Sequence, residues 1–188
     1  MPVASGFRPL RQRTLRRLPS KEHRGGRIAG GNGAVPSTMT HAAVGLGALA
    51  LTRPGRSSLA LWALSAGLSM LPDIDVITLA VGVPRNSLWS HRGITHSFAA
   101  ALVTGTLLAV VCGRRFAMQP RALGLYFSLV MASHGILDAF TNGGRGVAFF
   151  SPFDTHRYLF PVRPIPAAPI GFEYFSARGF RAFEAELL

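Results

Sequence analysis

Histidine and aspartate residues gather in a few short motifs of this 188-residue chain. The clearest motif is Ser133-His134-Gly135-Ile136-Leu137-Asp138, in which His134 and Asp138 lie four positions apart. On a helix this spacing puts both side chains on one face, about 6 Å apart along the axis. Such a pair suits two ligands of one metal ion, or one ligand and the carboxylate that orients it. A His–Asp hydrogen bond inside a core would explain the pair equally well.

Two carboxylates, Asp73 and Asp75, follow an apolar segment in the motif Leu71-Pro72-Asp73-Ile74-Asp75. At the C-terminal end of a helix they would face the negative end of the helix dipole, which is unfavourable without a nearby cation. A solvated turn is the alternative, because Pro-Asp is common in turns. Apolar sequence on both sides favours a cation site, in which either carboxylate could bridge two ions or act as a general base.

The motif His91-Arg92-Gly93-Ile94-Thr95-His96-Ser97 holds two further histidines. His91 and His96 are five residues apart, so they do not share a helix face and are expected to straddle a loop. Thr95 or Ser97 could cap the helix that follows. Arg92 could hold a phosphate or carboxylate oxygen and neutralise charge that develops during catalysis. The alternative is a polar loop with solvated histidines, which the neighbouring long apolar segment disfavours.

Composition limits which kind of site and which kind of fold are possible. Cys112 is the only cysteine, which excludes a disulfide within the chain and a thiolate zinc site, so a metal site would consist of histidines and carboxylates. Hydrophobic residues make up 48% and charged residues only 15%, a low charge fraction for a soluble domain.

Four apolar segments rich in Ala and Leu predict helices with no polar face, typical of buried or membrane helices. They are His41–Leu51, Leu59–Leu71, Phe98–Cys112 and Ala122–Phe140, with a shorter stretch at Val76–Val83. Only the last approaches the ~20 residues that span a bilayer, although the third, extended through Ser97 and Gly113, could span a thin one. The predicted fold is all-α: a small apolar multi-helix bundle, membrane-embedded, with an irregular C-terminal wrap from Gly143 and a short helix near Ser176–Leu188.

Connectivity predicts that the polar motifs meet. In an up-and-down bundle, successive helices are antiparallel. His41 then opens the first helix, the Asp73/Asp75 pair closes the second, His91 and His96 precede the third, and His134 and Asp138 end the fourth. All four sets fall at one end of the bundle, opposite the basic turns at 53–56 and 114–121. The predicted ligands of a divalent metal are His41, Asp73, Asp75, His91, His96, His134 and Asp138.

The net charge of +12 is concentrated in residues 1–38, which hold eight basic residues and one acidic residue. This segment is predicted to be a disordered basic tail, because it has too few apolar residues to fold by itself. Residues 39–188 are predicted to form the helical metal-binding domain. Nucleic-acid binding through the tail is disfavoured, since Phe7 is its only aromatic residue.

The succession of His41, residues 71–75, residues 91–97 and residues 133–138 resembles the YdjM-like membrane-bound metal-dependent hydrolases. The resemblance runs from about Met39 through Pro164, and residues 91–97 are its most specific part. It implies a distant similarity to zinc-dependent phospholipase C, an all-helical enzyme with a multinuclear site of His and Asp ligands, including a His-x-x-x-Asp pair. By that resemblance His134 and Asp138 supply the pair, and His156 is a candidate for a further downstream ligand.

These observations predict a multi-pass protein of the cell inner membrane, with membrane lipid around it and a divalent metal, Zn²⁺, at the site. The expected activity is hydrolysis of a phosphoester, such as a phospholipid, by metal-activated water, with Asp73, Asp75 and Arg92 as catalytic candidates. The alternative is a non-enzymatic membrane protein with a structural His/Asp metal site. The oligomeric state is not predicted.

Overall fold

The computed structural model describes residues 34–35, 38–53, 57–116, 118–166 and 168–169. Four helices dominate these residues: α1 (Thr38–Thr52), α2 (Leu59–Met70), α4 (Phe98–Cys112) and α5 (Pro120–Ala139). Short helical turns join them: η1 (Leu71–Val76), α3 (Ile77–Ala80), η2 (Ile94–His96) and η3 (Gly113–Arg115). The predicted all-helical fold is confirmed, and one antiparallel pair of two-residue strands, β1 (Ala34–Val35) and β2 (Ala168–Pro169), accompanies it.

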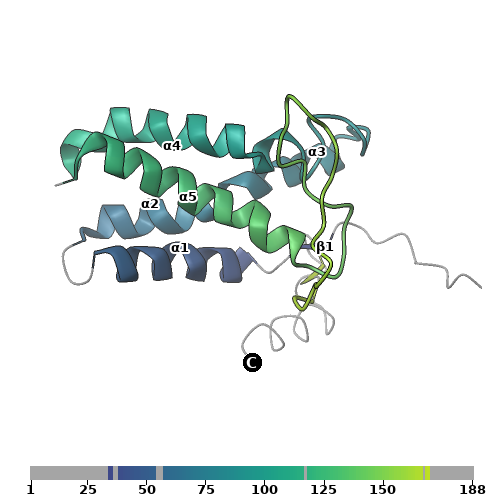
Figure 1. The fold of residues 1–188 in the computed structure, drawn as a ribbon, viewed down its shortest axis with the longest axis horizontal. Helices are drawn as coiled ribbons and strands as arrows, with labels where there is room; N and C mark the ends of the chain where they lie inside the picture. Colours follow the sequence, from purple (N-terminus) through teal and green to yellow (C-terminus); the bar gives the residue numbers. More distant parts are fainter. Residues whose placement is uncertain (1–33, 36–37, 54–56, 117, 167, 170–188) are drawn as a thin grey trace, which may run out of the picture. The chain divides into compact units, whose positions relative to one another are not determined.

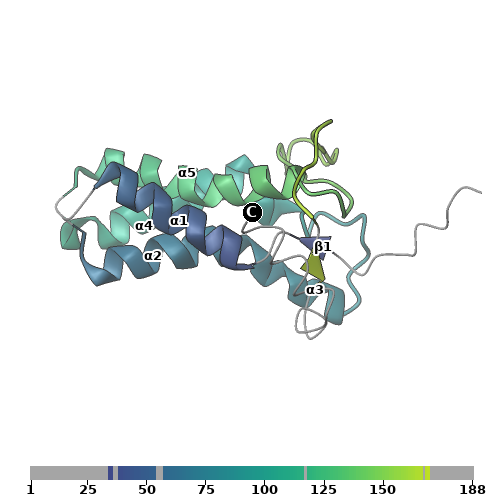
Figure 2. The same cartoon turned by 90° about the horizontal axis from the view of Figure 1, so that it is seen from below.

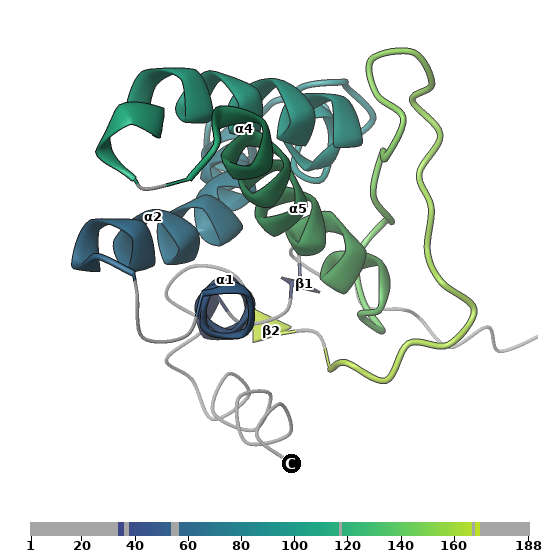
Figure 3. The ribbon, with the colours of Figure 1, turned by 60° about the vertical axis from the view of Figure 1, so that its left-hand side comes forward.

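Helix α5 is the central element of the bundle. It packs against α4 on one side and against α2 and α1 on the other, while α1 also packs against α2. Figure 1 shows the four helices running side by side, and Figure 3, which looks along α1, shows α5 between α4 and the α1–α2 pair. The view in Figure 2 has α1 and α2 next to each other over their length.

The helix boundaries follow local sequence signals. Ser58 and Ser97 are the N-caps of α2 and α4, and each side-chain oxygen accepts a hydrogen bond from the backbone N–H three residues on. Of the two caps proposed for the third main helix, the structure therefore uses Ser97. Pro120 occupies the first turn of α5, where its missing N–H costs no helical hydrogen bond. At Leu71 the α-helical path of α2 tightens into the 3₁₀ turn η1.

Small residues let the helices approach closely, as is common where helices pack in a membrane. A Cβ atom at Gly45 of α1 would lie 2.7 Å from Ser69 Oγ of α2, so only glycine fits there. Between α2 and α5, the hydroxyl groups of Ser65 and Tyr126 hydrogen-bond at 2.7 Å.

The buried apolar core lies between the four main helices. It is formed by Leu49, Leu61, Leu68, Ala101, Ala109, Phe116, Leu123, Tyr126, Phe127, Val130 and Met131.

Three helical segments are long and apolar enough to cross a membrane: Leu59–Ala80, Phe98–Arg115 and Pro120–Ala139. Helix α1 is apolar but shorter. The outer face of α4 exposes large apolar side chains, with Val110 at 72% and Val111 at 78%. Because an aqueous surface would not carry such a continuous apolar face, lipid is the natural environment of these helices.

The segment after α5 follows an irregular path beside the end of the bundle where α5 finishes (Figures 1 and 3). Isolated bridges join Thr141 to Ile165 and Val147 to Tyr158. A small cluster of Ala139, Val147 and Phe149 anchors it. The helix predicted near residues 176–188 and most of the predicted tail, residues 1–33 and 36–37, lie outside the described residues.

Candidate metal centre

The fold brings together side chains from four elements at one end of the bundle. His41 comes from α1, Asp73 and Asp75 from η1, His96 from η2, and His134 with Asp138 from α5; His91 lies in the loop before η2. All of these are buried except Asp73, which is partly buried. His156 is placed elsewhere: it is exposed, stacks edge-on against Tyr158, and its backbone N–H donates to Asp154.

Four of these side chains, those of Asp73, His96, His134 and Asp138, bring one donor atom each close together. His134 Nε2 lies 3.2 Å from His96 Nε2 and 3.3 Å from Asp73 Oδ1. His96 Nε2 lies 3.4 Å from Asp138 Oδ2 and 3.7 Å from Asp73 Oδ1. A tetrahedral zinc ion with ligand bonds of 2.0–2.2 Å separates its ligand atoms by about 3.3–3.6 Å. These four separations are close to that spacing, and all four donor atoms lie within 4.8 Å of one another.

Hydrogen bonds at the far side of both rings leave the two Nε2 atoms available. His134 Nδ1 lies 2.7 Å from the carbonyl oxygen of Ser69, which only accepts, so Nδ1 carries the hydrogen. His96 Nδ1 lies 3.1 Å from Asp75 Oδ2 and 3.0 Å from Thr95 Oγ1, so it donates in the same way. A metal-ligating histidine needs this arrangement, because the outer N–H bond fixes the tautomer.

Asp75 is the acceptor that organises the loop around the site. Its Oδ1 lies 2.6 Å from His91 Nδ1, and its Oδ2 accepts from the backbone N–H of Arg92 at 3.2 Å. Oδ2 also accepts a short hydrogen bond from the Thr95 hydroxyl and contacts His96. Asp75 thus orients two histidines and the backbone between them.

A second group of potential ligands overlaps the first. Asp73, Asp75, His91 and His96 place one donor atom each within 4.8 Å of one another, as do Asp73, His96, His134 and Asp138. Since His91 Nδ1 faces Asp75, its Nε2 is the free lone-pair atom, and it is buried with no hydrogen-bond partner among the described residues. Asp73 and His96 are common to both groups.

His41 stacks on His134, with ring centroids 3.7 Å apart and an interplanar angle of 19°. Its Nε2 lies 3.6 Å from Asp138 Oδ1, and it is fully buried. His41 thus lies against the ring and the carboxylate of two predicted ligands, outside the two four-residue groups.

Arg92 is directed inward, toward Asp138. Its Nε forms an ion pair with Asp138 Oδ2 at 2.8 Å, and its terminal nitrogens donate to Thr141 Oγ1 and the Gly143 carbonyl, both at 3.2 Å. The side chain is only 2% exposed. Its φ of 63° lies in the left-handed region, which is rare for a non-glycine residue and recurs at functional sites.

Several supporting residues were not expected from the sequence. Arg157 donates to the carbonyl oxygens of His91 and Arg92 at 3.0 and 3.2 Å, and to Ser90 Oγ at 2.6 Å, which holds the loop in place. Gly135 lets α5 approach the loop, because a Cβ atom there would lie 2.8 Å from the His96 carbonyl oxygen. Nothing in the sequence around Arg157 indicates this role. Gly135 could have been noticed, because it lies between His134 and Asp138 in the His–Asp motif.

The carboxylates dominate the electrostatics of His96. Burial by itself would lower the pKa of its imidazole, but hydrogen bonds with Asp138, Asp73 and Asp75 outweigh burial. As a result the pKa of His96 lies well above its usual range. The centre therefore attracts positive charge, whether a proton or a metal ion.

Comparison with known proteins agrees with this membrane architecture. Residues 37–186 match the family described as YdjM inner membrane protein. The chain is also 36% identical over 162 residues to inner membrane protein YbcI of Escherichia coli (strain K12), an alignment that covers 82% of this chain and 90% of that protein. No solved structure matches the chain. Together with its three candidate spans, these matches show that the chain is a multi-pass inner membrane protein and belongs to the YdjM inner membrane protein family.

Proposed function

We propose that this membrane protein is a metal-dependent hydrolase that cleaves a phosphoester with a metal-activated water. The observation that supports this proposal is the set of four donor atoms, from Asp73, His96, His134 and Asp138, which all lie within 4.8 Å of one another. Asp73 is 14% exposed, while the side chains of the other three are fully buried. The Asp73 side chain therefore lies at the edge of the centre, although its Oδ1 atom, which faces the two histidines, is itself buried.

A divalent ion held by these four residues, with Zn²⁺ as the expected ion, would lower the pKa of a water molecule and polarise a phosphoryl oxygen. Of the two carboxylates considered for catalysis, Asp73 has an oxygen, Oδ1, without a hydrogen-bond partner among the described residues, so we assign it to the reacting water. Asp75 has both oxygens occupied by donors from His91, Arg92 and Thr95. We assign Asp75 to positioning the histidines.

Arg92 receives a positioning role in this proposal. Its guanidinium group pairs with Asp138 and donates to Thr141 and Gly143, inside a region with almost no solvent access. In this arrangement it offsets the charge of the buried carboxylate and fixes the oxygen that faces His96. Direct contact with a substrate phosphate would require the Asp138 pair to open.

We propose one tightly held ion at the group that contains His134 and Asp138. The second group, with His91 and Asp75, would bind a second ion more weakly, because Asp75 Oδ1 and Oδ2 already accept hydrogen bonds there. His91 and Asp73 would be its principal donors. His41 supports the first group through its stack on His134.

A structural metal site in a non-enzymatic membrane protein is the second candidate. The complete burial of His134 and Asp138 favours it, since closed coordination is typical of structural sites. The two candidates differ in how the ion is coordinated: a structural site is closed by four protein ligands, whereas a catalytic site keeps one position for water.

The test is to purify the protein in detergent, measure bound metal, and assay phosphodiester, phosphomonoester and lipid substrates with added zinc. We expect about one ion per chain, lost in His134→Ala and Asp138→Ala and retained in the matched control His156→Ala. Asp73→Asn is expected to lose hydrolysis. Retained metal without activity toward any substrate would support the structural candidate, and an unchanged metal content in His134→Ala and Asp138→Ala, both folded, would exclude the site.

A further inference from the structure

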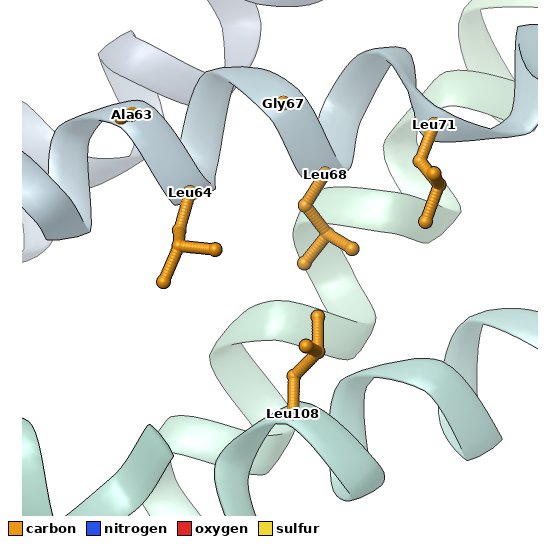
Figure 4. Close-up of a pocket in the computed structure, with 6 residues that line it drawn as sticks. All are labelled: Ala63, Leu64, Gly67, Leu68, Leu71 and Leu108. Atoms are coloured by element: carbon orange, nitrogen blue, oxygen red, sulfur yellow. The ribbon is translucent and has the colours of Figure 1, made fainter. Parts of the chain in front are cut away.

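Exposed apolar side chains continue along the bundle past the level of the candidate metal centre. The open hollow between α2 and α4 is lined by apolar residues, and the last of them along the chain from α2 is Leu71, the first residue of η1 (Figure 4). Beyond it Ile74, Ile77 and Val81 are exposed, Ile77 at 64%. Figures 1 and 2 show η1 and α3 prolonging α2 beyond the end of α1. The apolar surface of this span therefore does not end at the centre.

The wrap after α5 carries further apolar side chains at the same end. Phe153 is 90% exposed, and Phe150 is half exposed. The ring of Phe150 meets the ring of Phe98 edge-on, with centroids 6.0 Å apart, and Phe98 is the first residue of α4. Because Phe98 is itself partly exposed, the apolar outer face of α4 continues onto the wrap.

A third exposed apolar side chain belongs to Trp89, which lies in the loop two residues before His91 and is 64% exposed. The term apolar collar is used here for six residues: Ile74, Ile77, Val81, Trp89, Phe150 and Phe153. They come from three separate segments, and Figure 2 shows α3 and the wrap on opposite sides of this end of the bundle. A protein docked on one side would leave the other side uncovered, whereas lipid surrounds a membrane protein on every side.

The length of α4 places the collar at the border of the hydrocarbon core. The segment Phe98–Arg115 has 18 residues, which is ~27 Å at 1.5 Å per residue, and the hydrocarbon core is ~30 Å thick. Arg114 and Arg115 are exposed at one end of this segment, where they belong among the headgroups. Phe98, at the other end, then lies near the opposite border, and His96 of the metal centre lies two residues before it.

Exposed arginines alternate with the collar along the sequence. Arg85 lies between Val81 and Trp89, and Arg145 lies five residues before Phe150. A guanidinium group deep among acyl chains is costly, but at the headgroup level an arginine keeps its charge in water while its stem lies on apolar surface. Tryptophan is enriched at the same level. The mixture of arginine with exposed aromatic residues thus favours the interfacial layer over the hydrocarbon interior.

We propose that the apolar collar is embedded in the interfacial layer of the bilayer, where headgroups meet acyl chains. The same three segments hold the metal centre: η1 carries Asp73, the loop carries His91, and Arg157 of the wrap donates to the carbonyl oxygen of His91. The centre therefore lies at the level of the membrane surface and not in a domain surrounded by bulk water. This position does not depend on the proposed hydrolase activity.

Fluorescence tests the depth of the collar, because Trp62 and Trp89 are the only tryptophans of the chain. The full-length Trp62→Phe variant, which keeps Trp89, is reconstituted in phosphatidylcholine vesicles whose acyl chains carry bromine near the headgroup or near the methyl end. Bromine quenches tryptophan at contact. We expect bromine near the headgroup to lower Trp89 fluorescence about twofold, and bromine near the methyl end to lower it less.

The control is Leu107→Trp in a Trp62→Phe, Trp89→Phe background. Leu107 is exposed near the middle of α4, so bromine near the methyl end should quench this variant more strongly than bromine near the headgroup. Ile77→Trp and Phe153→Trp in the same background probe the two opposite sides of the collar. We expect both to show the Trp89 pattern, and quenching on one side only would overturn the proposal.

Two other results for Trp89 would overturn the proposal. Quenching by aqueous iodide and by neither brominated lipid would mean that the collar faces bulk water. Protection from iodide and from both lipids would mean that another protein surface covers it, and light scattering would show whether that surface belongs to a second copy of the chain. If a variant with a new tryptophan loses its helical circular dichroism, Trp89 in the conservative Trp62→Phe variant decides.

Discussion

The Nε2 atoms of His96 and His134 face each other at 3.2 Å, and each ring uses its Nδ1 hydrogen elsewhere. Two lone pairs at this distance repel each other unless a cation lies between them. In the metal-free protein this cation is a proton on His96, because the pKa of His96 is raised. A divalent ion would replace that proton and gain the carboxylates of Asp73 and Asp138 as further ligands.

The proton and the metal should therefore compete, which predicts the pH dependence of zinc binding. Because the pKa of His96 is raised, zinc must displace its proton at any pH below that pKa. Zinc affinity should therefore fall there by about tenfold per pH unit, for one displaced proton. Protonated His96 also stabilises the metal-free fold. This contribution to the free energy of unfolding is fully present below the unfolded-state pKa of about 6.5, and it is lost as the pH rises through the folded-state pKa. Chelator-competition titrations and metal-free unfolding, each measured over a pH series, should show these opposite trends. Zinc affinity that does not change with pH would contradict the prediction.

Asp75 should control zinc affinity without being a strong ligand. Asp75→Asn keeps the size of the side chain, but its amide group can no longer accept from His91 Nδ1 and His96 Nδ1 at both oxygen positions. Loss of such an orienting carboxylate typically costs 10–100-fold in metal affinity. Competition with a calibrated chelator should show a loss of about this size, with the exposed Asp154→Asn as the control. A complete loss of metal would instead make Asp75 a principal ligand.

Arg92 should contribute to stability mainly when the metal is absent. Arg92→Met leaves the Asp138 carboxylate buried without its cation, and breaking a buried ion pair of this kind costs about 3–5 kcal/mol. Unfolding in detergent should show a large loss without zinc and a smaller one with saturating zinc, since the ion then compensates the same carboxylate. The control is Arg114→Met, because Arg114 is exposed in η3 at the other end of the bundle. If the free energy of unfolding falls equally with and without zinc, Arg92 and the bound ion do not act on the same carboxylate.

Much of the architecture could be predicted from the sequence, because long apolar runs between Pro, Gly and Arg breaks define helices with little ambiguity. Antiparallel connectivity then placed four polar sets at one end without any knowledge of side-chain contacts. The roles of individual residues could not be predicted in the same way. Whether Asp75 is a ligand or an orienting acceptor depends on the path of the loop before η2, and so does the inward direction of Arg92. That path is held by contacts distant in sequence, such as Arg157 with the carbonyl oxygens of His91 and Arg92.

The change of helix type at Leu71 has a consequence for how this centre is assembled. In a regular α-helix the N–H of Asp73 would bond the Ser69 carbonyl, whereas in the 3₁₀ turn it points to the carbonyl of Met70. Pro72 has no N–H, and the N–H of Leu71 bonds Leu68. Ser69 therefore has a spare carbonyl oxygen, and His134 uses it to fix its tautomer. Because this carbonyl oxygen is not used within the helix, the backbone of α2 fixes the tautomer of a histidine on α5. The site therefore has the correct protonation pattern before an ion binds.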